Sequence, residues 1–202
     1  MSTFALPVQT WQSDVNARYA GSLDEQEQTI LTRDGVQLVC RLMTPDDAPL
    51  LVDLFRRMSP ETRRRRFHYP IDIVEEDRLL EDARRLANVD NRTHGGAVVA
   101  LERAADGEHI VGVARLMRPA KQPKAPEVEA AITVRDDYHG RGLGTELLRR
   151  MVLLAKRMHA KTIVAEIEAD NYAAIRLFRE LNLTTVSTTS HGETTMRMEV
   201  PA

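Results

Sequence analysis

The chain has 202 residues, of which 43% are hydrophobic and 29% are charged; its formal net charge is −2 and it contains one cysteine. These values are typical of one globular domain with an extension, and they exclude an internal disulfide, a cysteine-based zinc cluster and a chain-wide attraction to nucleic acid. The sequence has neither a basic-then-apolar leader nor an apolar run of about 18 residues, so we expect a cytoplasmic protein without a membrane partner.

The first 34 residues differ in character from the rest, because they show no clear hydrophobic period and mix polar stretches with Phe4, Leu6 and Trp11. We therefore divide the chain into an N-terminal extension, residues 1–34, and a domain, residues 35–202. Two hypotheses fit the extension: a partly ordered arm packed on its own domain, or an arm exchanged within a homodimer. The oligomeric state stays open.

The domain begins with a predicted strand, residues 36–43, in which Leu38, Cys40 and Leu42 alternate onto one face. Three helix start signals follow it: Thr44-Pro45, Ser59-Pro60, and Asp72 with Glu75. Four consecutive arginines, 63–66, belong to the second of these helices and point around more than half of its circumference. We interpret them as a solvated, ion-paired helix, with docking of an acidic protein or of a cofactor phosphate as the alternative.

From residue 96 onward, strands and helices alternate. The predicted strands are 96–103, 109–117, 128–134, 162–168 and a final hairpin over 184–200, and the predicted helices are 142–158 and 171–181. The strand–helix–strand unit in the middle predicts one parallel pair, whereas the hairpins predict antiparallel neighbours. The expected fold is therefore an α+β domain with a mixed, mostly antiparallel sheet flanked by helices.

Three glycines, Gly140, Gly142 and Gly144, lie between the strand at 128–134 and the helix that follows. Glycine in a helix interior destabilises the helix by roughly 1 kcal/mol. The presence of glycines at a helix start therefore needs another reason. Bare backbone N–H groups at a helix N-terminus attract anions, and Arg135 and Arg141 add positive charge. The segment predicts a phosphate or pyrophosphate site, with a tight turn that binds nothing as the alternative.

Two stretches, "VRDDYHGRGLGTELLRRMVLLAKR" and "NYAAIRLFRELNL", resemble the two motifs of the GNAT superfamily of N-acetyltransferases. His139 stands where that family has Gln or Arg, and Asn182 stands where it often has glycine. More narrowly, "SPETRRRRF", "VGVARL" and the run from Glu129 to Gly144 are similar to bacterial protein lysine acetyltransferases that modify acyl-CoA synthetases. The resemblance covers residues 36 to 200.

The resemblance implies that acetyl-CoA lies in a V where strands 128–134 and 162–168 splay apart. It assigns the pantetheine arm to the backbone of Ile132, Thr133 and Val134. It assigns the cofactor phosphates to a cradle made of His139, Gly140, Arg141, Gly142, Leu143, Gly144 and Thr145. It adds Asn171 as a contact to the cofactor or the splayed strand, besides its role as a helix N-cap, and Phe178 as packing for the cofactor arm. The six histidines have no metal spacing, so we expect no metal.

Acetyl transfer to an amine needs a group that takes the amine proton, and Glu129 is the candidate base. Strand alternation places it with Ala131 and Thr133, and the narrower family carries its glutamate base there. The alternative is a solvated edge residue. Glu127, assigned to the proline-rich loop, is the reserve, and Glu166 and Glu168 are weaker candidates.

The expected function is acetyl-CoA-dependent N-acetylation of a primary amine by direct transfer in a ternary complex. A protein lysine is the preferred acceptor, and a small amine is the alternative; helices within 45–87 and the loop 118–127 would form its pocket. Phe178 occupies the position where many family members have a tyrosine acid, so the acid stays open, with water as a candidate. A catalytically silent acyl-CoA-binding regulator is the hypothesis from another class.

Overall fold

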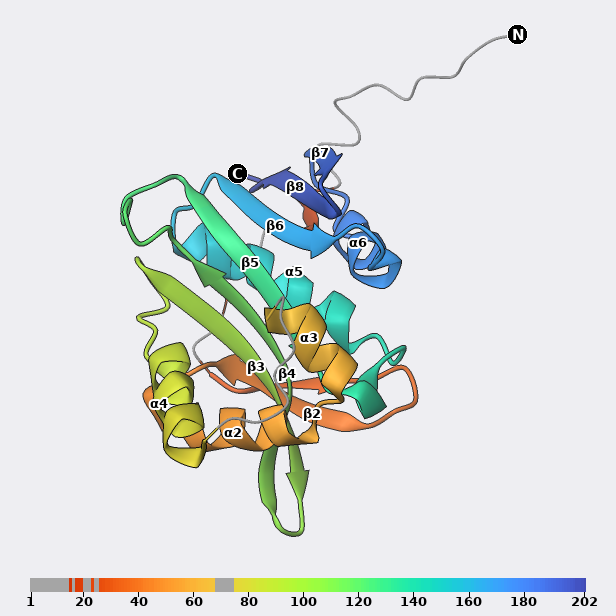
Figure 1. The fold of residues 1–202 in the computed structure, drawn as a ribbon. Coiled ribbons are helices and arrows are strands. Elements are labelled where there is room, and N and C mark those ends of the chain that lie inside the picture. The colour runs from red at the N-terminus through yellow and green to blue at the C-terminus, as the bar shows by residue number, and fades with distance from the viewer. Residues whose placement is uncertain (1–14, 16, 20–22, 24–25, 68–74) are drawn as a thin grey trace, which may run out of the picture.

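The computed structural model describes residues 15, 17–19, 23, 26–67 and 75–202 (Figure 1). Its centre is one sheet with the strand order β1-β2-β3-β4-β5-β6-β8-β7. The strands are β1 (Gln28–Leu31), β2 (Gln37–Leu42), β3 (Gly95–Ala104), β4 (Gly107–Met117), β5 (Glu127–Val134), β6 (Thr162–Glu168), β7 (Thr185–Ser190) and β8 (Glu193–Glu199). Among the strands of the described residues, only β5 and β6 pair in parallel, which confirms the mixed, mostly antiparallel sheet.

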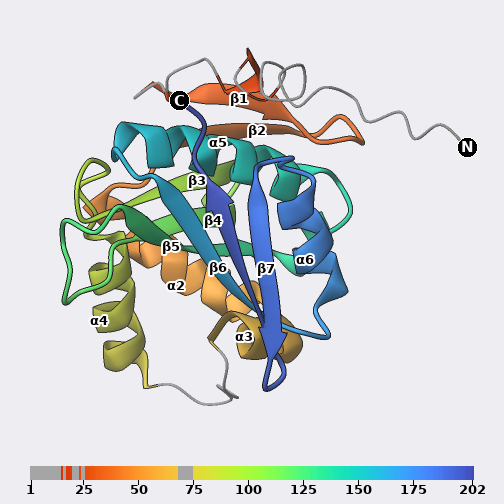
Figure 2. The same ribbon diagram turned by 90° about the horizontal axis from the view of Figure 1, so that it is seen from above.

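Helices lie on both faces of the sheet (Figure 2). They are α2 (Ala48–Arg57), α3 (Pro60–Phe67), α4 (Glu76–Ala87), α5 (Leu143–Arg157) and α6 (Tyr172–Arg179), with 3-10 turns η1 (Pro45–Asp47) and η2 (Asp136–Tyr138). The predicted starts at Thr44 and Ser59 are confirmed. Asp72 lies outside the described residues, and the helix expected near it begins at Glu76.

Two hydrophobic cores share the sheet, because β3 and β4 are buried on both faces. The first lies between α5 and the sheet and contains Leu147, Leu148 and Met151 of α5, together with Leu38 and Cys40 of β2. Burial raises the pKa of the Cys40 thiol to about 11, as expected for a core residue and not for a reactive one. The second core lies under α2 and α4 and includes Val99, Leu101 and Ile110.

The described part of the first 34 residues packs against this domain. β1 pairs antiparallel with β2, and Val15, Tyr19 and Ile30 belong to the first core. The Tyr19 hydroxyl donates a hydrogen bond to the carbonyl of Leu181, 162 residues away. Phe4, Leu6 and Trp11 lie outside the described residues, so the role of the whole extension and its boundary stay predictions.

One boundary in the second half is corrected. Glu127 begins β5 and does not belong to the preceding loop, because its backbone is already in register with Thr162 of β6. Its carboxylate forms an ion pair with Arg197 of β8. Asn182, at φ 55°, ends the segment after α6 in the left-handed conformation that the sequence suggested.

Candidate active site

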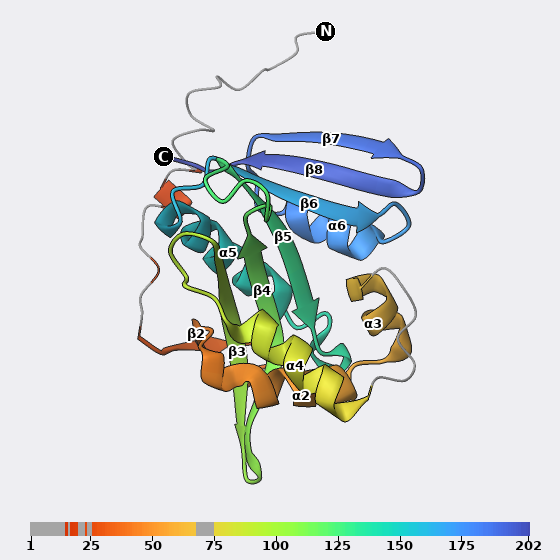
Figure 3. The ribbon, with the colours of Figure 1, turned by 60° about the vertical axis from the view of Figure 1, so that its left-hand side comes forward.

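β5 and β6 separate halfway along their length. Their parallel register runs only from Glu127, opposite Thr162, to Ala130, opposite Ala165. Beyond this point, β5 continues on β4 up to Val134, and β6 continues on β8 up to Glu168. The two strands therefore form a V, whose open end lies beside α3 and α6 (Figure 3). The expected splay is confirmed.

The glycine segment lies just beyond the β5 limb of the V. Gly140 and Gly142 adopt φ of 74° and 85°, a conformation that side chains disfavour. α5 begins at Leu143, and its first internal hydrogen bond runs from Glu146 N–H to the carbonyl of Gly142. The N–H groups of the first helical turn are thus left for another acceptor, as an anion cradle requires.

Gly144 is needed for a different reason. A Cβ at this position would lie 2.9 Å from Cδ2 of Leu177, so Gly144 allows α6 to approach α5 closely. A Cβ on Gly142 would lie 3.2 Å from Cγ and Nε of Arg33. Arg33 lies in the turn between β1 and β2, and its N–H donates to the carbonyl of Arg141 at 2.9 Å. The N-terminal segment therefore supplies a cation at the cradle, which the sequence analysis had not identified.

A cavity of about 530 Å³ joins the V to the cradle. The predicted residues that line it are Ile132, Thr133, Val134, His139, Gly140, Gly142, Gly144, Thr145 and Asn171. Arg65 and Arg66 also line it, in keeping with the cofactor-phosphate alternative for the arginine run. Arg33, Thr62 and Arg176 line it as well and were not predicted. Glu180 also lines the cavity and pairs with Arg176, and Arg65 pairs with Glu61, so Arg33 and Arg66 supply the net positive charge that a site for a phosphorylated ligand needs.

Four predicted residues lie elsewhere. Phe178 and the side chain of Leu143 belong to the first core, with exposed fractions of 3% and 2%. Arg141 pairs with Asp34, 2.8 Å away, and stacks on Tyr138. Glu129 is exposed on β5, one position before the strands part, and does not line the cavity.

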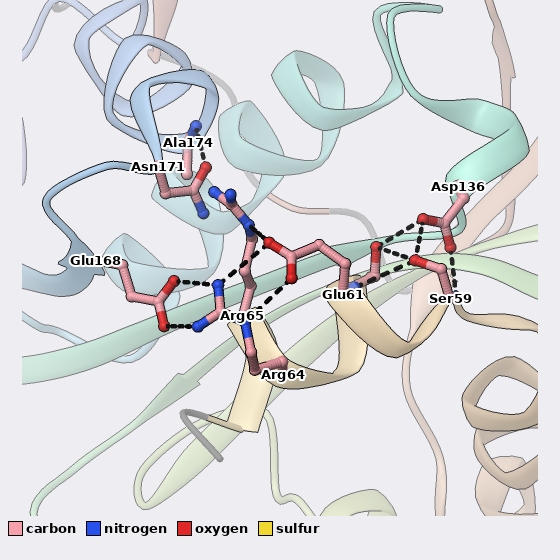
Figure 4. Close-up of polar contacts among 9 residues, drawn as sticks. Ser59, Glu61, Arg64, Arg65, Asp136, Glu168, Asn171 and Ala174 are labelled. Carbon is pink, nitrogen blue, oxygen red and sulfur yellow. Dashed lines mark hydrogen bonds and ion pairs between the residues drawn. The ribbon is translucent and has the colours of Figure 1, made fainter. Parts of the chain in front are cut away.

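His139 and Asn171 have defined partners. The carbonyl of Val134 lies 2.8 Å from Nε2 of His139, so this nitrogen donates the hydrogen bond and ties the loop back to β5. The side chain of Asn171 accepts from the N–H of Ala174 at 3.2 Å, which confirms the predicted helix N-cap (Figure 4). Both residues hold the walls of the cavity in place.

Helix α3 bridges the two limbs of the V (Figure 4). Asp136, just past β5, accepts hydrogen bonds from the N–H and hydroxyl of Ser59 and from the hydroxyl of Thr62, at 2.7–2.8 Å. Burial opposes the ionisation of Asp136, but these hydrogen bonds bring its pKa below the ordinary value. At the other limb, Arg64 forms a two-pronged ion pair with Glu168, at 2.7 and 3.0 Å.

The arginine run is therefore only partly a solvated face. None of the residues of α3 is buried, and Arg64 and Arg65 both pair with Glu61, as predicted. The contact from Arg64 to Glu168 spans 104 residues of sequence, however, and makes the helix a strap across the open end of the V.

The four candidate bases differ in whether their carboxylates already form ion pairs. Glu127, Glu129, Glu166 and Glu168 lie on the sheet face opposite α5, because their neighbours Val128, Ile163, Ala165 and Ile167 belong to the first core. Glu127 is paired with Arg197, and Glu168 with Arg64. Within the described residues, neither Glu129 nor Glu166 makes an ion pair or hydrogen bond, so the ion pairs leave both carboxylates as candidate bases.

No group of three or more His, Cys, Asp or Glu side chains in the described ranges gathers in a way that would hold a metal ion. No helix in the described part of the chain is long and apolar enough to cross a membrane.

A parallel strand pair that parts, an anion cradle just beyond one limb and a cavity between them define an acyl-CoA-binding domain. Comparison with known proteins specifies the class. Residues 37–184 match the family model described as an acetyltransferase (GNAT) domain. The chain therefore belongs to the GNAT acetyltransferases, enzymes whose acetyl donor is acetyl-CoA.

Solved structures share this fold. The GNAT domain of Streptomyces lividans PAT superposes with a TM-score of 0.72 at 24% identity, covering 86% of this chain and 96% of that one. The Salmonella typhimurium protein YncA, solved with its cofactor acetyl-CoA, superposes with a TM-score of 0.57 at 22% identity, over 81% and 94% of the two chains.

Two curated relatives come from Pseudomonas aeruginosa. The L-methionine sulfoximine/L-methionine sulfone acetyltransferase is 36% identical over 101 residues, which are 49% of this chain and 58% of the relative. The chain thus matches less than two thirds of that enzyme. Acetyltransferase PA5475 is 30% identical over 141 residues, 69% of this chain and 71% of the relative.

Proposed function

We propose that the protein transfers the acetyl group of acetyl-CoA directly to a primary amine, with Glu129 as the general base. The observation that carries the proposal is the cavity between the open limbs of the V, which reaches from the glycine cradle to helix α3. The backbone N–H groups at the start of α5, with Arg33 beside them, would hold the cofactor phosphates. The backbone of β5 beyond Ala130 would pair with the pantetheine arm.

The reaction needs few groups from the protein. An amine that approaches from the face opposite α5 would meet Glu129 at the point where the strands part. Loss of its proton to this carboxylate would free the nitrogen lone pair to attack the thioester carbonyl. The new C–N bond then forms as the C–S bond breaks, and water supplies the proton to the thiolate, which is a tolerable leaving group.

Two acceptors are candidates, and each has its own support. The resemblance of the sequence to protein lysine acetyltransferases favours a protein lysine. The identity to an acetyltransferase that acts on L-methionine sulfoximine and L-methionine sulfone favours a small amine. We infer that both would present a primary amine to the same carboxylate, so the base and cofactor assignments hold for either.

Calorimetric titration with acetyl-CoA, with CoA and ATP as controls, tests the cofactor site. A second assay measures thiol release with lysine peptides and small amines. Binding of acetyl-CoA at micromolar concentration together with N-acetylation supports the proposal. Binding without turnover of any amine would identify a silent acyl-CoA-binding module instead.

A further inference from the structure

The turn between β1 and β2, residues 32–35, borders the cofactor cavity although it lies outside the family domain, whose match begins at residue 37. Arg33 of this turn lines the cavity. Its Cγ and Nε lie 3.2 Å from the point that a Cβ on Gly142 would occupy. Gly142 is the N-cap of α5, so the Arg33 side chain lies across the start of that helix.

Local hydrogen bonds fix the shape of this turn. The N–H of Gly35 donates to the carbonyl of Thr32 at 3.0 Å, and Gly35 adopts a φ of 86°, which a side chain disfavours. The buried Thr32 hydroxyl donates to Asp34 at 2.6 Å, and the N–H of Val36 donates to the same hydroxyl at 2.9 Å. Arg33 is therefore presented from a closed turn and has a defined direction.

Two contacts join the turn to the glycine cradle. The N–H of Arg33 donates to the carbonyl of Arg141 at 2.9 Å, and the Asp34 carboxylate pairs with the Arg141 guanidinium at 2.8 Å. That guanidinium also stacks on the buried ring of Tyr138, 4.9 Å from its centroid. The cradle contains two glycines at positive φ, which give the backbone freedom, so these contacts hold the loop and the turn in one arrangement.

The two arginines that the sequence assigned to phosphate binding are engaged elsewhere. Arg135 is 6% exposed and donates to Glu102 and Asp137, at 2.6–3.0 Å. Arg141 is held by Asp34, and neither arginine lines the cavity. Arg33 thus takes the place at the cradle that the sequence had given to Arg135 and Arg141.

A pyrophosphate needs such a cation at the start of α5. The helix start supplies only about half an elementary charge, which is less than the negative charge of a pyrophosphate. A guanidinium beside the first turn supplies the missing charge and donates in the planar geometry that phosphate oxygens accept. Arg176 on the α6 side of the cavity is less suited, because it pairs with Glu180.

We infer that the β1–β2 turn selects the acyl donor: Arg33 binds the pyrophosphate of acetyl-CoA, and Asp34 is a positioning residue that holds Arg33 in place through Arg141. This inference rests on the proposed function and deepens it. The enzyme then favours thioesters that carry a pyrophosphate over those that carry pantetheine alone, and a segment outside the family domain determines this preference.

The test compares three donors: acetyl-CoA, its 3′-dephospho form, and S-acetylpantetheine, which has no phosphate. Arg33→Gln should lower kcat/KM for the first two by the same factor, about tenfold, because a hydrogen bond to a charged group is lost with each. Its kcat/KM for S-acetylpantetheine should stay within about twofold of the wild type. Arg85→Gln, which removes an exposed arginine paired with Glu81 on α4, is the matched control. Thermal unfolding checks that each variant is folded.

Asp34→Asn tests the positioning role, because it removes the charge but keeps an oxygen that accepts from Thr32. It should raise KM for acetyl-CoA by about twofold to fourfold without a change in kcat, since exposed ion pairs are weak. Added to Arg33→Gln, it should have no further effect, because it acts through Arg33. Asp34→Glu should restore part of the loss. Asp46→Asn, an exposed carboxylate in η1 away from the cavity, is its control.

Four outcomes overturn the inference and leave the proposed function standing. An unchanged donor preference in Arg33→Gln would show that Arg33 binds no phosphate. An equal loss with all three donors would make its role structural, and a loss with acetyl-CoA alone would assign it to the 3′-phosphate. Tighter acetyl-CoA binding by Asp34→Asn would make the freed Arg141 the phosphate ligand. Failure of the wild type to bind acetyl-CoA or to acetylate any amine overturns the proposed function and this inference with it.

Discussion

The closed and open halves of the β5–β6 pair are held by different means. In the closed half, backbone hydrogen bonds join Glu127–Ala130 to Thr162–Ala165, and Val128 and Ile163 are fully buried. In the open half, side chains of α3 reach both limbs, at Asp136 and at Glu168. The difference shows how one sheet combines rigidity with an accessible strand edge: side chains set the width of the V, and the backbone of β5 stays free for a ligand.

The charged side chains also differ between the closed half of the β5–β6 pair and its boundary with the open half. Glu127, in the closed half, is neutralised by Arg197. At the boundary, Glu129 on β5 and Glu166 on β6 have no cationic partner within the described residues.

The largest effect should come from Gly142→Asp in the cradle of the open half. The substitution places a carboxylate beside the expected cofactor phosphates, in a backbone conformation that costs a side chain about 1–2 kcal/mol. We expect acetyl-CoA binding to weaken by about 100-fold or more in a calorimetric titration. Gly192→Asp is the control, because Gly192 has a similar φ of 82° but open space around it. Normal binding by the Gly142 variant would show that this loop holds no phosphate.

The next largest effect should be a loss of activity on substitution of Glu129, which lies at the boundary between the two halves. Glu129→Gln keeps the shape of the side chain but removes the base, so kcat/KM for the amine should fall by about 100-fold or more. Acetyl-CoA affinity, measured separately, should change little. Glu127→Gln, two residues away on the same face, should retain activity because its carboxylate is already paired with Arg197. Equal activity of the two variants would move the base to another residue.

The order of elements was predictable because its signals are local. Hydrophobic period, helix caps and turn residues identified the helices and strands of residues 36–67 and 75–200, and the strand–helix–strand rule placed the one parallel pair. β1 was missed because four residues at a sheet edge carry little pattern of their own and depend on pairing with β2. Glu127 was assigned to the loop because the proline before it obscures the start of the strand.

The site was predictable where it depends on the backbone and less so where it depends on side chains. Glycines between a strand and a helix indicate a cradle from sequence alone, although Gly144 is glycine chiefly to admit Leu177. The contacts of α3 join residues 74 and 104 positions apart, and no local pattern signals such pairs. Arg33 was not predicted as a site residue because it lies in the segment that was assigned to the N-terminal extension.

A smaller effect should follow from opening the strap on the β6 limb. Glu168→Gln removes a partly exposed, two-pronged ion pair with Arg64 but leaves the contacts of Ser59 and Thr62 with Asp136. Such pairs contribute about 1 kcal/mol or less at a protein surface, so we expect a fall in kcat of about threefold to tenfold and only a small change in melting temperature. Arg64 also pairs with the exposed Glu61, so Glu61→Gln is the matched control and should have less effect on kcat. A drop in stability without any change in kcat would make the strap purely structural.

The smallest effect lies outside both halves, at the β3–β4 hairpin, and concerns pH. Nε2 of His109 lies 3.0 Å from Asp106 and Nδ1 lies 2.9 Å from Asp53, so both ring nitrogens meet carboxylates. These hydrogen bonds raise the pKa of His109 above its ordinary value. A raised pKa in the folded state means that the stabilisation is complete below about pH 6.5, the unfolded pKa, and is lost as the pH rises through the folded pKa. The melting temperature of the wild type should therefore fall more between pH 6 and 9 than that of His109→Gln, by about 1–3 °C.

His191→Asn, in the exposed turn before β8, should follow the wild type. An identical pH dependence in the wild type and His109→Gln would show that the histidine is not held in its charged form, and would leave the paired carboxylates around the V as the source of any pH effect.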